Sequence, residues 1–340
     1  MPNPSNSFSN KPLRILSIDG GGVRGIVPAR LLTEMEQQLQ TQYPGKSLWQ
    51  CFDLITGTST GGIIALAIAF GIPAKEVLDF YLTKSKIIFG NKKWAGSLFY
   101  AKHERADLER IVRDLFAEYH GGADPLIGDC KTHVAIPIYD LNTGCPRILK
   151  SAYHPLLERD HQLPAYMAAM ATSAAPTFFE PYSAFYRNFT GKKIDFLHNI
   201  DGGLFANNPS LGCLIEVQRS FNVPLKDISM LSLGTGHLRH FDQQQRSNYG
   251  LFYWMRKSRL IEVFLQAQAQ EVENLISIMK NGLGKSDPDS FTYIRADAEM
   301  NSKTKIELDE TSPRKLAYLS DIGRDLWHKH QLEINKEFLN

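Results

Sequence analysis

The segment Gly57-Thr58-Ser59-Thr60-Gly61 places one serine between two glycines, where an apolar strand pattern gives way to a helical one. Small neighbours allow the backbone to turn sharply and leave the serine hydroxyl accessible at the end of the strand. A serine hydroxyl becomes a strong nucleophile only when a neighbouring base removes its proton. The spacing therefore predicts a nucleophile elbow for acyl transfer at Ser59, although the same residues also suit an ordinary tight turn.

A second glycine-rich corner, Ser17–Gly25, follows another predicted strand and contains Gly20-x-Gly22-x-x-Gly25. This spacing matches a dinucleotide fingerprint, but the next predicted strand ends in Thr56–Ser59 instead of the acid that would hold a ribose. Backbone N–H groups freed by glycines at a helix start also bind negative charge, such as the oxyanion of ester hydrolysis. Arg24 would either strengthen the positive field there or form a structural salt bridge.

The third corner, Asn199–Ser210, offers a base for Ser59. Asp201 closes an apolar strand and precedes Gly202 and Gly203. An Asp-Gly pair by itself is a common turn. However, an acid at the end of a third parallel strand reaches the same crevice as Ser59, and burial raises its pKa toward the range of a general base.

A histidine base is the alternative, because hydrolase triads with this elbow run Ser, acid, His along the chain. His237 follows the apolar strand pattern 228–236 and is the best-placed of the ten histidines. His198 lies three residues before Asp201 and is expected within or beside a strand. No sequence feature pairs either histidine with Ser59, so dyad and triad both stay open at this point.

Strand and helix patterns alternate along the chain and predict the elements that must hold these corners. Strands are expected at 13–19, 52–56, 132–140, 146–153, 196–203 and 228–236, and helices at 26–40, after 59, at 75–89, 105–119, 164–175, 208–221 and 259–279. This alternation predicts an α/β fold, a three-layer α/β/α sandwich with a mostly parallel central sheet. We expect a disordered lead-in over 1–12, one catalytic domain over 13–292 and a helical C-terminal extension over 293–340 packed on it.

Composition is typical of a soluble globular protein, with 43% hydrophobic and 22% charged residues. A net charge of +2 gives no strong attraction to nucleic acid. The four cysteines form no C-x-x-C pair, which disfavours a zinc site, and we expect neither a metal nor a cofactor. No apolar run reaches the roughly 18 residues of a membrane span, and no secretory signal begins the chain. A cytoplasmic protein is expected.

The three corners together resemble the patatin-like phospholipase family. That family is marked by Asp-Gly-Gly-Gly-x-Arg/Lys-Gly, Gly-x-Ser-x-Gly and Asp-Gly-Gly/Ala in this order. The corresponding residues are DGGGVRG (Asp19–Gly25), GTSTG (Gly57–Gly61) and DGG (Asp201–Gly203). Segments 171–182, 207–210 and 231–236 also look like family hallmarks, so the resemblance spans about residues 13–237.

The resemblance implies a Ser59–Asp201 dyad in place of a triad. It implies a lipid acyl hydrolase of the phospholipase A or lysophospholipase type, acting through an acyl-serine intermediate without metal. Amides of the first motif would form the oxyanion hole, and the remaining residues of the second and third motifs would hold the dyad. These positions are Gly20, Gly21, Gly22, Val23, Arg24 and Gly25, then Gly57, Thr58, Thr60 and Gly61, then Gly202 and Gly203.

A lipid substrate requires transient contact with a membrane surface. Two stretches, 84–100 and 248–259, mix basic and aromatic residues in the way that interfacial segments do. Phe178, Phe179 and one of Met167 and Met170 are candidates for the wall of an acyl pocket. The sequence does not show whether a regulatory ligand or protein partner is needed. Three rival functions stay open: another acyl-ester hydrolase or thioesterase, a nucleotide-binding protein using Gly20–Gly25, and a catalytically silent interaction module.

Overall fold

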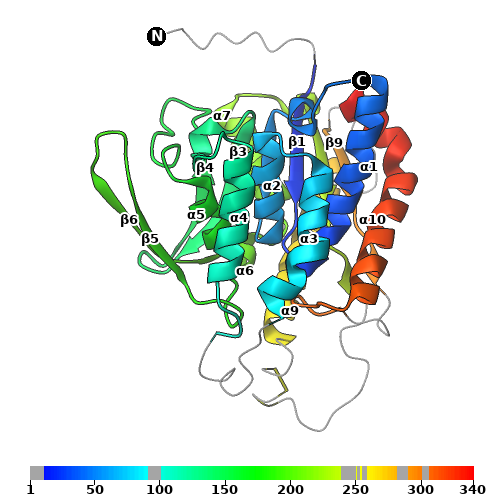
Figure 1. Ribbon diagram of the computed structural model, residues 1–340. Helices are drawn as coiled ribbons and strands as arrows, with labels where there is room; N and C mark the ends of the chain where they lie inside the picture. The colour runs from blue at the N-terminus through cyan, green and yellow to red at the C-terminus, as the bar shows by residue number, and fades with distance from the viewer. Residues whose placement is uncertain are drawn as a thin grey trace.

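The computed structural model describes residues 11–90, 101–238, 250, 253–254, 259–281, 290–300 and 306–340. Within this part of the chain, one eight-stranded sheet forms the middle layer, with helices on both sides of it (Figure 1). Its strands are β1 (Leu13–Ile18), β2 (Leu54–Gly57), β3 (His133–Asp140), β4 (Cys145–Lys150), β5 (Tyr182–Arg187), β6 (Lys193–Asp201), β7 (Ile228–Leu233) and β9 (Thr292–Ala296). The chain therefore adopts the expected three-layer α/β/α fold.

The strand order is β5-β6-β3-β2-β1-β7-β9, with β4 paired to β3. Strands β3, β2, β1, β7 and β9 run parallel, whereas β4 and β6 are antiparallel to β3, and β5 is antiparallel to β6. The β5–β6 hairpin extends away from the rest of the sheet at the left of Figure 1. The sheet is thus mostly parallel, with an antiparallel side.

The residues of β1 show why helices cover both faces of the sheet. Leu16 and Ile18 pack into one apolar cluster, and Leu13 and Ile15 pack into another. Successive side chains of a strand point to opposite faces, so a central strand with buried apolar residues on both faces must be covered on both sides. The helices are α1 (Ile26–Gln42), α2 (Thr60–Phe70), α3 (Ala74–Phe89), α4 (Ala106–Glu118), α5 (Ala165–Thr172), α6 (Gly203–Ala206), α7 (Ser210–Ser220), α9 (Arg259–Asn281) and α10 (Pro313–Ile334).

The first cluster lies between the sheet and helices α1 to α5 and α10, and the second between the sheet and helices α7 and α9. Helix α2 is buried along its whole length, from Thr60 to Phe70. The predicted helices and the six predicted strands are all present, but two strands of the eight-stranded sheet were not predicted. β5 falls within a segment without strong alternation, and β9 falls at the start of the expected extension.

The C-terminal residues are built into the sheet and onto α1. β9 pairs in parallel with β7, from Ser229–Thr292 to Leu233–Ala296. A small parallel pair, β8 (His237–Leu238) with β10 (Glu299–Met300), lies next along the chain. Helix α10 then lies alongside α1 (Figure 1), and its buried residues include Leu319 and Trp327. The expected lead-in falls largely outside the described residues, since the description begins at residue 11.

None of the described helices is both long and apolar enough to cross a bilayer.

Candidate active site

Ser59 occupies a strained turn between β2 and α2. Its backbone has φ 56° and ψ −124°, a conformation that non-glycine residues rarely adopt. The Ser59 amide donates to Thr172 Oγ1 at 3.0 Å, and the Thr172 hydroxyl donates to the Pro137 carbonyl at 2.7 Å. Strain of this kind persists only where the surroundings hold it in place, and it is characteristic of a nucleophile elbow.

The two glycines of the elbow are required by close backbone contact. A Cβ atom on Gly57 would collide with the carbonyl of Gly61, and one on Gly61 would collide with the carbonyl of Ile18. Thr58 is buried, and its hydroxyl donates to the Ala206 carbonyl at 2.6 Å, just beyond the Asp-Gly-Gly corner. The elbow is therefore tied directly to the chain that follows Asp201.

Strand register brings Asp201 level with Ser59. Thr56 of β2 pairs with Ala135 of β3, so β3 continues past the end of β2, and Ile138 lies three residues further along. Asp201 pairs with Ile138, and it does so from an antiparallel strand. The expectation that Asp201 ends a parallel strand is thus wrong. The two side chains meet because β3 extends beyond the end of β2, and β6 pairs with this extension of β3 in the antiparallel direction.

Asp201 is buried, with 4% of its surface exposed. Burial raises the pKa of its carboxyl to about 7, because a carboxylate loses its hydration there. Hydrogen bonds from the Ser59 hydroxyl and from the Gly203 amide, the latter at 2.7 Å, act in the opposite direction. Asp201 therefore has the hydrogen-bond partner and the pKa that a general base for Ser59 needs.

Ser59 and Asp201 both open into one apolar cavity. Apart from polar atoms at these two residues, its wall is formed mainly by aromatic and aliphatic side chains: Ile63, Phe80, Ile88, Phe89, Leu108, Phe178, Phe179, Leu265 and Leu308. Phe178 and Phe179 are thus on the wall, as expected. Met167 and Met170 are instead buried residues of α5 and do not line this cavity. The open space is about 50 Å³, which is narrow for a fatty acyl chain.

Two backbone amides of the Gly20–Gly25 corner are available at this cavity. The Gly20 amide donates to the Asn207 carbonyl at 2.9 Å, and the Val23 amide donates to the Leu308 carbonyl at 2.8 Å. Gly21 and Gly22 line the apolar cavity beside Ser59, and their amides bind no acceptor in the described part of the chain. The expected set of oxyanion donors, Gly20 to Gly25, is thereby narrowed to these two.

The two candidate histidines have other partners. His237 Nδ1 lies 3.0 Å from Asp297 Oδ2, and this hydrogen bond raises the pKa of His237. His198 Nδ1 lies 2.7 Å from Asn142 Oδ1 on the β5–β6 side. Neither histidine is on the wall of the apolar cavity as the described residues define it.

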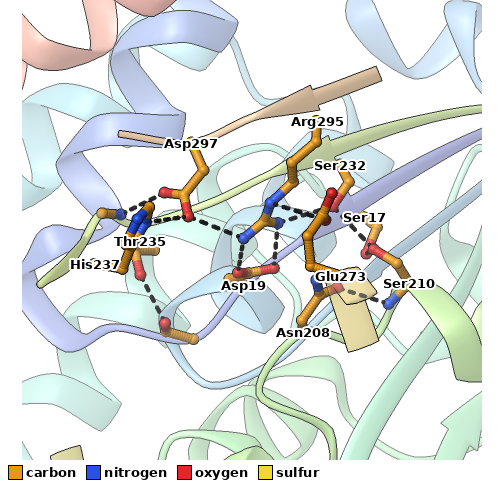
Figure 2. A network of polar contacts seen from close by, with 12 residues as sticks. Ser17, Asp19, Asn208, Ser210, Ser232, Thr235, His237, Glu273, Arg295 and Asp297 are labelled. Atoms are coloured by element: carbon orange, nitrogen blue, oxygen red, sulfur yellow. Dashed lines mark hydrogen bonds and ion pairs between the residues drawn. The ribbon is translucent and has the colours of Figure 1, made fainter. Parts of the chain in front are cut away.

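A separate polar cavity of about 410 Å³ adjoins the glycine-rich corner. Its wall includes Asp19, Arg24, His237, Arg295 and Asp297, together with one side of α9. The Arg24 Nε donates to the Gly21 carbonyl at 3.4 Å, so this side chain supports the corner's own backbone. Arg24 lines this polar cavity and not the apolar cavity at Ser59. Figure 2 shows Arg295 between Asp19 and Asp297, with His237 on the far side of Asp297.

Comparison with known proteins decides the family. The model of the patatin-like phospholipase family matches residues 16–213, more than half of the chain. The chain belongs to the patatin-like phospholipase family. Members of this family hydrolyse lipid esters, and this chain is a hydrolase of that kind.

Two relatives match nearly the full length of this family member. A cGAMP-activated phospholipase of Escherichia coli is 32% identical over 94% of this chain and 90% of its own. One of Vibrio cholerae is 31% identical over 96% of this chain and 94% of its own. The solved structure of VipD from Legionella pneumophila aligns with a TM-score of 0.40 at 11% identity, over 95% of this chain and 68% of its own.

Sequence reasoning missed several residues that support the patatin-like site. Thr172 lies in the segment 171–182, which resembled the family, but its bond to the Ser59 amide depends on packing between distant segments. Leu308 and Arg295 come from the presumed C-terminal extension. The apolar alternation of 291–296 could have revealed a strand there, although not its place beside β7.

Proposed function

We propose that this protein releases fatty acid from membrane phospholipids through a Ser59–Asp201 dyad, with phospholipase A or lysophospholipase specificity. The observation that carries the proposal is that Ser59 and a buried Asp201, whose pKa is about 7, are hydrogen-bonded at the wall of one apolar cavity. An apolar cavity suits an acyl chain, and a polar corner beside it suits the ester.

In the proposed reaction, Ser59 Oγ attacks the ester carbonyl carbon while its proton passes to the Asp201 carboxylate. The amides of Gly21 and Gly22 stabilise the negative oxygen of the tetrahedral intermediate. The bond to the leaving alcohol then breaks, and Asp201 returns the proton to that alcohol. A water molecule attacks acyl-Ser59 in the same manner, which releases the fatty acid and restores both side chains.

The test measures fatty acid released from mixed phospholipid vesicles in the presence of a chelator. Ser59→Ala and Asp201→Asn should each reduce release to background. Ser220→Ala, half-buried on α7, and Asp227→Asn, exposed before β7, are matched controls that line neither cavity and should keep wild-type rates. A fluorophosphonate probe should label wild type and not Ser59→Ala. Full activity in Ser59→Ala, or loss in His237→Ala with retention in Asp201→Asn, would overturn the dyad.

We also propose that a regulatory ligand controls this activity, and that it is cGAMP. The proposal is supported by the two bacterial relatives, which are named for activation by this compound. It is also supported by the narrow apolar cavity, which must widen before an acyl chain can enter. Adding cGAMP should increase fatty acid release by wild type and have no effect on Ser59→Ala. Equal rates with and without cGAMP would remove the regulation but leave the hydrolysis intact.

A further inference from the structure

A buried arginine reaches the glycine-rich corner from the opposite end of the sequence. Arg295 lies on β9, and β7 separates β9 from β1. The register aligns Arg295 with Ser232 and Ser232 with Ser17, so the three side chains lie in one row across the sheet (Figure 2). The guanidinium extends along that row to the end of β1.

Arg295 holds Asp19 with both terminal nitrogens. Nη1 donates to Asp19 Oδ1 at 3.0 Å, and Nη2 donates to Asp19 Oδ2 at 2.6 Å. Such a two-bond pair fixes the direction of the carboxylate as well as its distance. Both side chains are largely buried, at 14% and 4% exposure, so water screens the pair weakly.

The remaining donors of Arg295 fix the guanidinium itself. Nη1 also donates to Ser232 Oγ at 2.9 Å, and Nη2 donates to Asp297 Oδ2 at 3.1 Å. Asp297 is held in turn by His237 Nδ1 and by the Gly236 amide. The guanidinium therefore cannot turn away from Asp19 without breaking several other contacts (Figure 2).

Asp19 is the residue immediately before the glycines of the corner. Its amide donates to the Leu233 carbonyl, and the Gly20 carbonyl accepts from the Thr235 hydroxyl at 2.8 Å. Gly21 and Gly22 follow without side chains of their own to fix them. The segment that carries their amides is anchored on one side at Asp19, by the Arg295 pair, and on the other side at Val23, by the Leu308 carbonyl.

Resting on the proposed function, we propose that Arg295 is a positioning residue for catalysis. It acts through Asp19 to aim the Gly21 and Gly22 amides at the oxyanion, and it does not touch the substrate's reacting atoms. Small displacements of preorganised donors are costly for the transition state and much less so for substrate binding. The predicted signature is a loss in kcat with little change in KM.

The experiment uses the full-length protein with phospholipid vesicles, and it counts active sites by fluorophosphonate labelling of Ser59. Arg295→Met should lower kcat per labelled site by about 10- to 100-fold and leave KM within about 2-fold of wild type. Arg295→Lys should recover part of the loss, because it keeps the charge but not the two-bond geometry. The matched control is Arg324→Met, which makes the same substitution at an exposed arginine of α10 and should keep the wild-type kcat.

A second comparison separates positioning from simple support of the fold. Because Arg295 acts through Asp19, the double variant Asp19→Asn with Arg295→Met should be no slower than Arg295→Met alone. The proposal would be overturned if the losses in kcat of the two single variants multiply in the double variant. It would also be overturned if Arg295→Met lowers the melting temperature but leaves kcat per labelled site unchanged. If Arg295→Met does not fold, Asp19→Asn and Arg295→Lys carry the same kcat and KM comparison. An inactive wild type would refute the proposed function itself, whereas an active wild type and an equally active Arg295→Met would refute only this inference.

Discussion

Asp201 combines two requirements that ordinarily conflict in one carboxyl group. As the proposed general base, it must be ionised to take the Ser59 proton, and it must be basic enough to attract that proton. Full burial meets the second requirement by raising the pKa to about 7, and the hydrogen bonds from Ser59 and Gly203 keep the ionised form accessible. The chemistry of the site is thus set by where one carboxylate lies.

This pKa predicts how activity depends on pH. Because Asp201 is active as the carboxylate, kcat/KM should rise with pH through about 7 and level off above it. Below that pH it should fall about tenfold per unit, as the carboxylate becomes protonated. Initial rates of fatty acid release between about pH 5 and pH 9 measure the profile. A profile that is flat through pH 7 would contradict the assigned base.

The same raised pKa predicts the stability of Asp201→Asn. Between the unfolded pKa near 4 and the folded pKa near 7, the folded state binds more protons at this residue, so the ionised side chain destabilises the fold as pH rises. Asparagine has no charge to desolvate. The difference in free energy of unfolding between Asp201→Asn and wild type should therefore shift in favour of the variant as pH rises, by roughly 2 to 4 kcal/mol between pH 4 and pH 8. Denaturant unfolding at both pH values measures it, and a constant difference would contradict the burial of a titrating carboxyl.

At the scale of elements, the site depends on three chain segments meeting at the end of β2. Asp201 lies on β6, which pairs antiparallel with the part of β3 that extends beyond β2. Helix α5 provides Thr172, whose hydroxyl oxygen accepts from the Ser59 amide. The first turn of α2 passes so close to β1 that only glycine fits at position 61. The elbow is therefore as sensitive to backbone spacing as to the nucleophile itself.

Two glycines in helices should respond in opposite ways to alanine. Gly61→Ala places a methyl group against the Ile18 carbonyl and should lower both activity and stability, the latter by roughly 2 kcal/mol or more. Gly212→Ala on α7 meets no atom within 4 Å and should raise stability by about 0.5 to 1 kcal/mol with unchanged activity. Chemical denaturation and vesicle assays test the pair. Equal effects of the two substitutions would argue against the close contact at Gly61.

At the scale of the whole molecule, the C-terminal residues are inseparable from the sheet. β9 completes the parallel side, Leu308 closes the apolar cavity, and α10 covers α1. We propose that residues 13–340 unfold as one unit. This proposal differs from the sequence-based expectation of a catalytic domain that ends at residue 292 and a separate extension that begins at residue 293.

Two leucines of α10 provide the test. Leu319 is fully buried against the core, whereas Leu332 is 81% exposed. Leu319→Ala should lower the free energy of unfolding of the whole protein by about 3 kcal/mol, because it leaves a cavity, and Leu332→Ala should change it by less than about 0.5 kcal/mol. The transition should remain single when followed by tryptophan fluorescence and by loss of enzymatic activity. A separate early transition in Leu319→Ala would show that α10 unfolds independently.

Local pattern was enough to predict the alternating elements and the three glycine-rich corners, whereas the pairing of Ser59 with Asp201 was implied only by the resemblance of these corners to a known family. Strand periodicity and glycine spacing are properties of neighbouring residues, so one sequence displays them directly. The antiparallel direction of β6, the commitment of the Gly20 and Val23 amides, and the Asp19–Arg295 pair were decided only by tertiary structure. Each of these joins segments that are between 59 and 285 residues apart. Strand order, which no local pattern encodes, determines which segments meet.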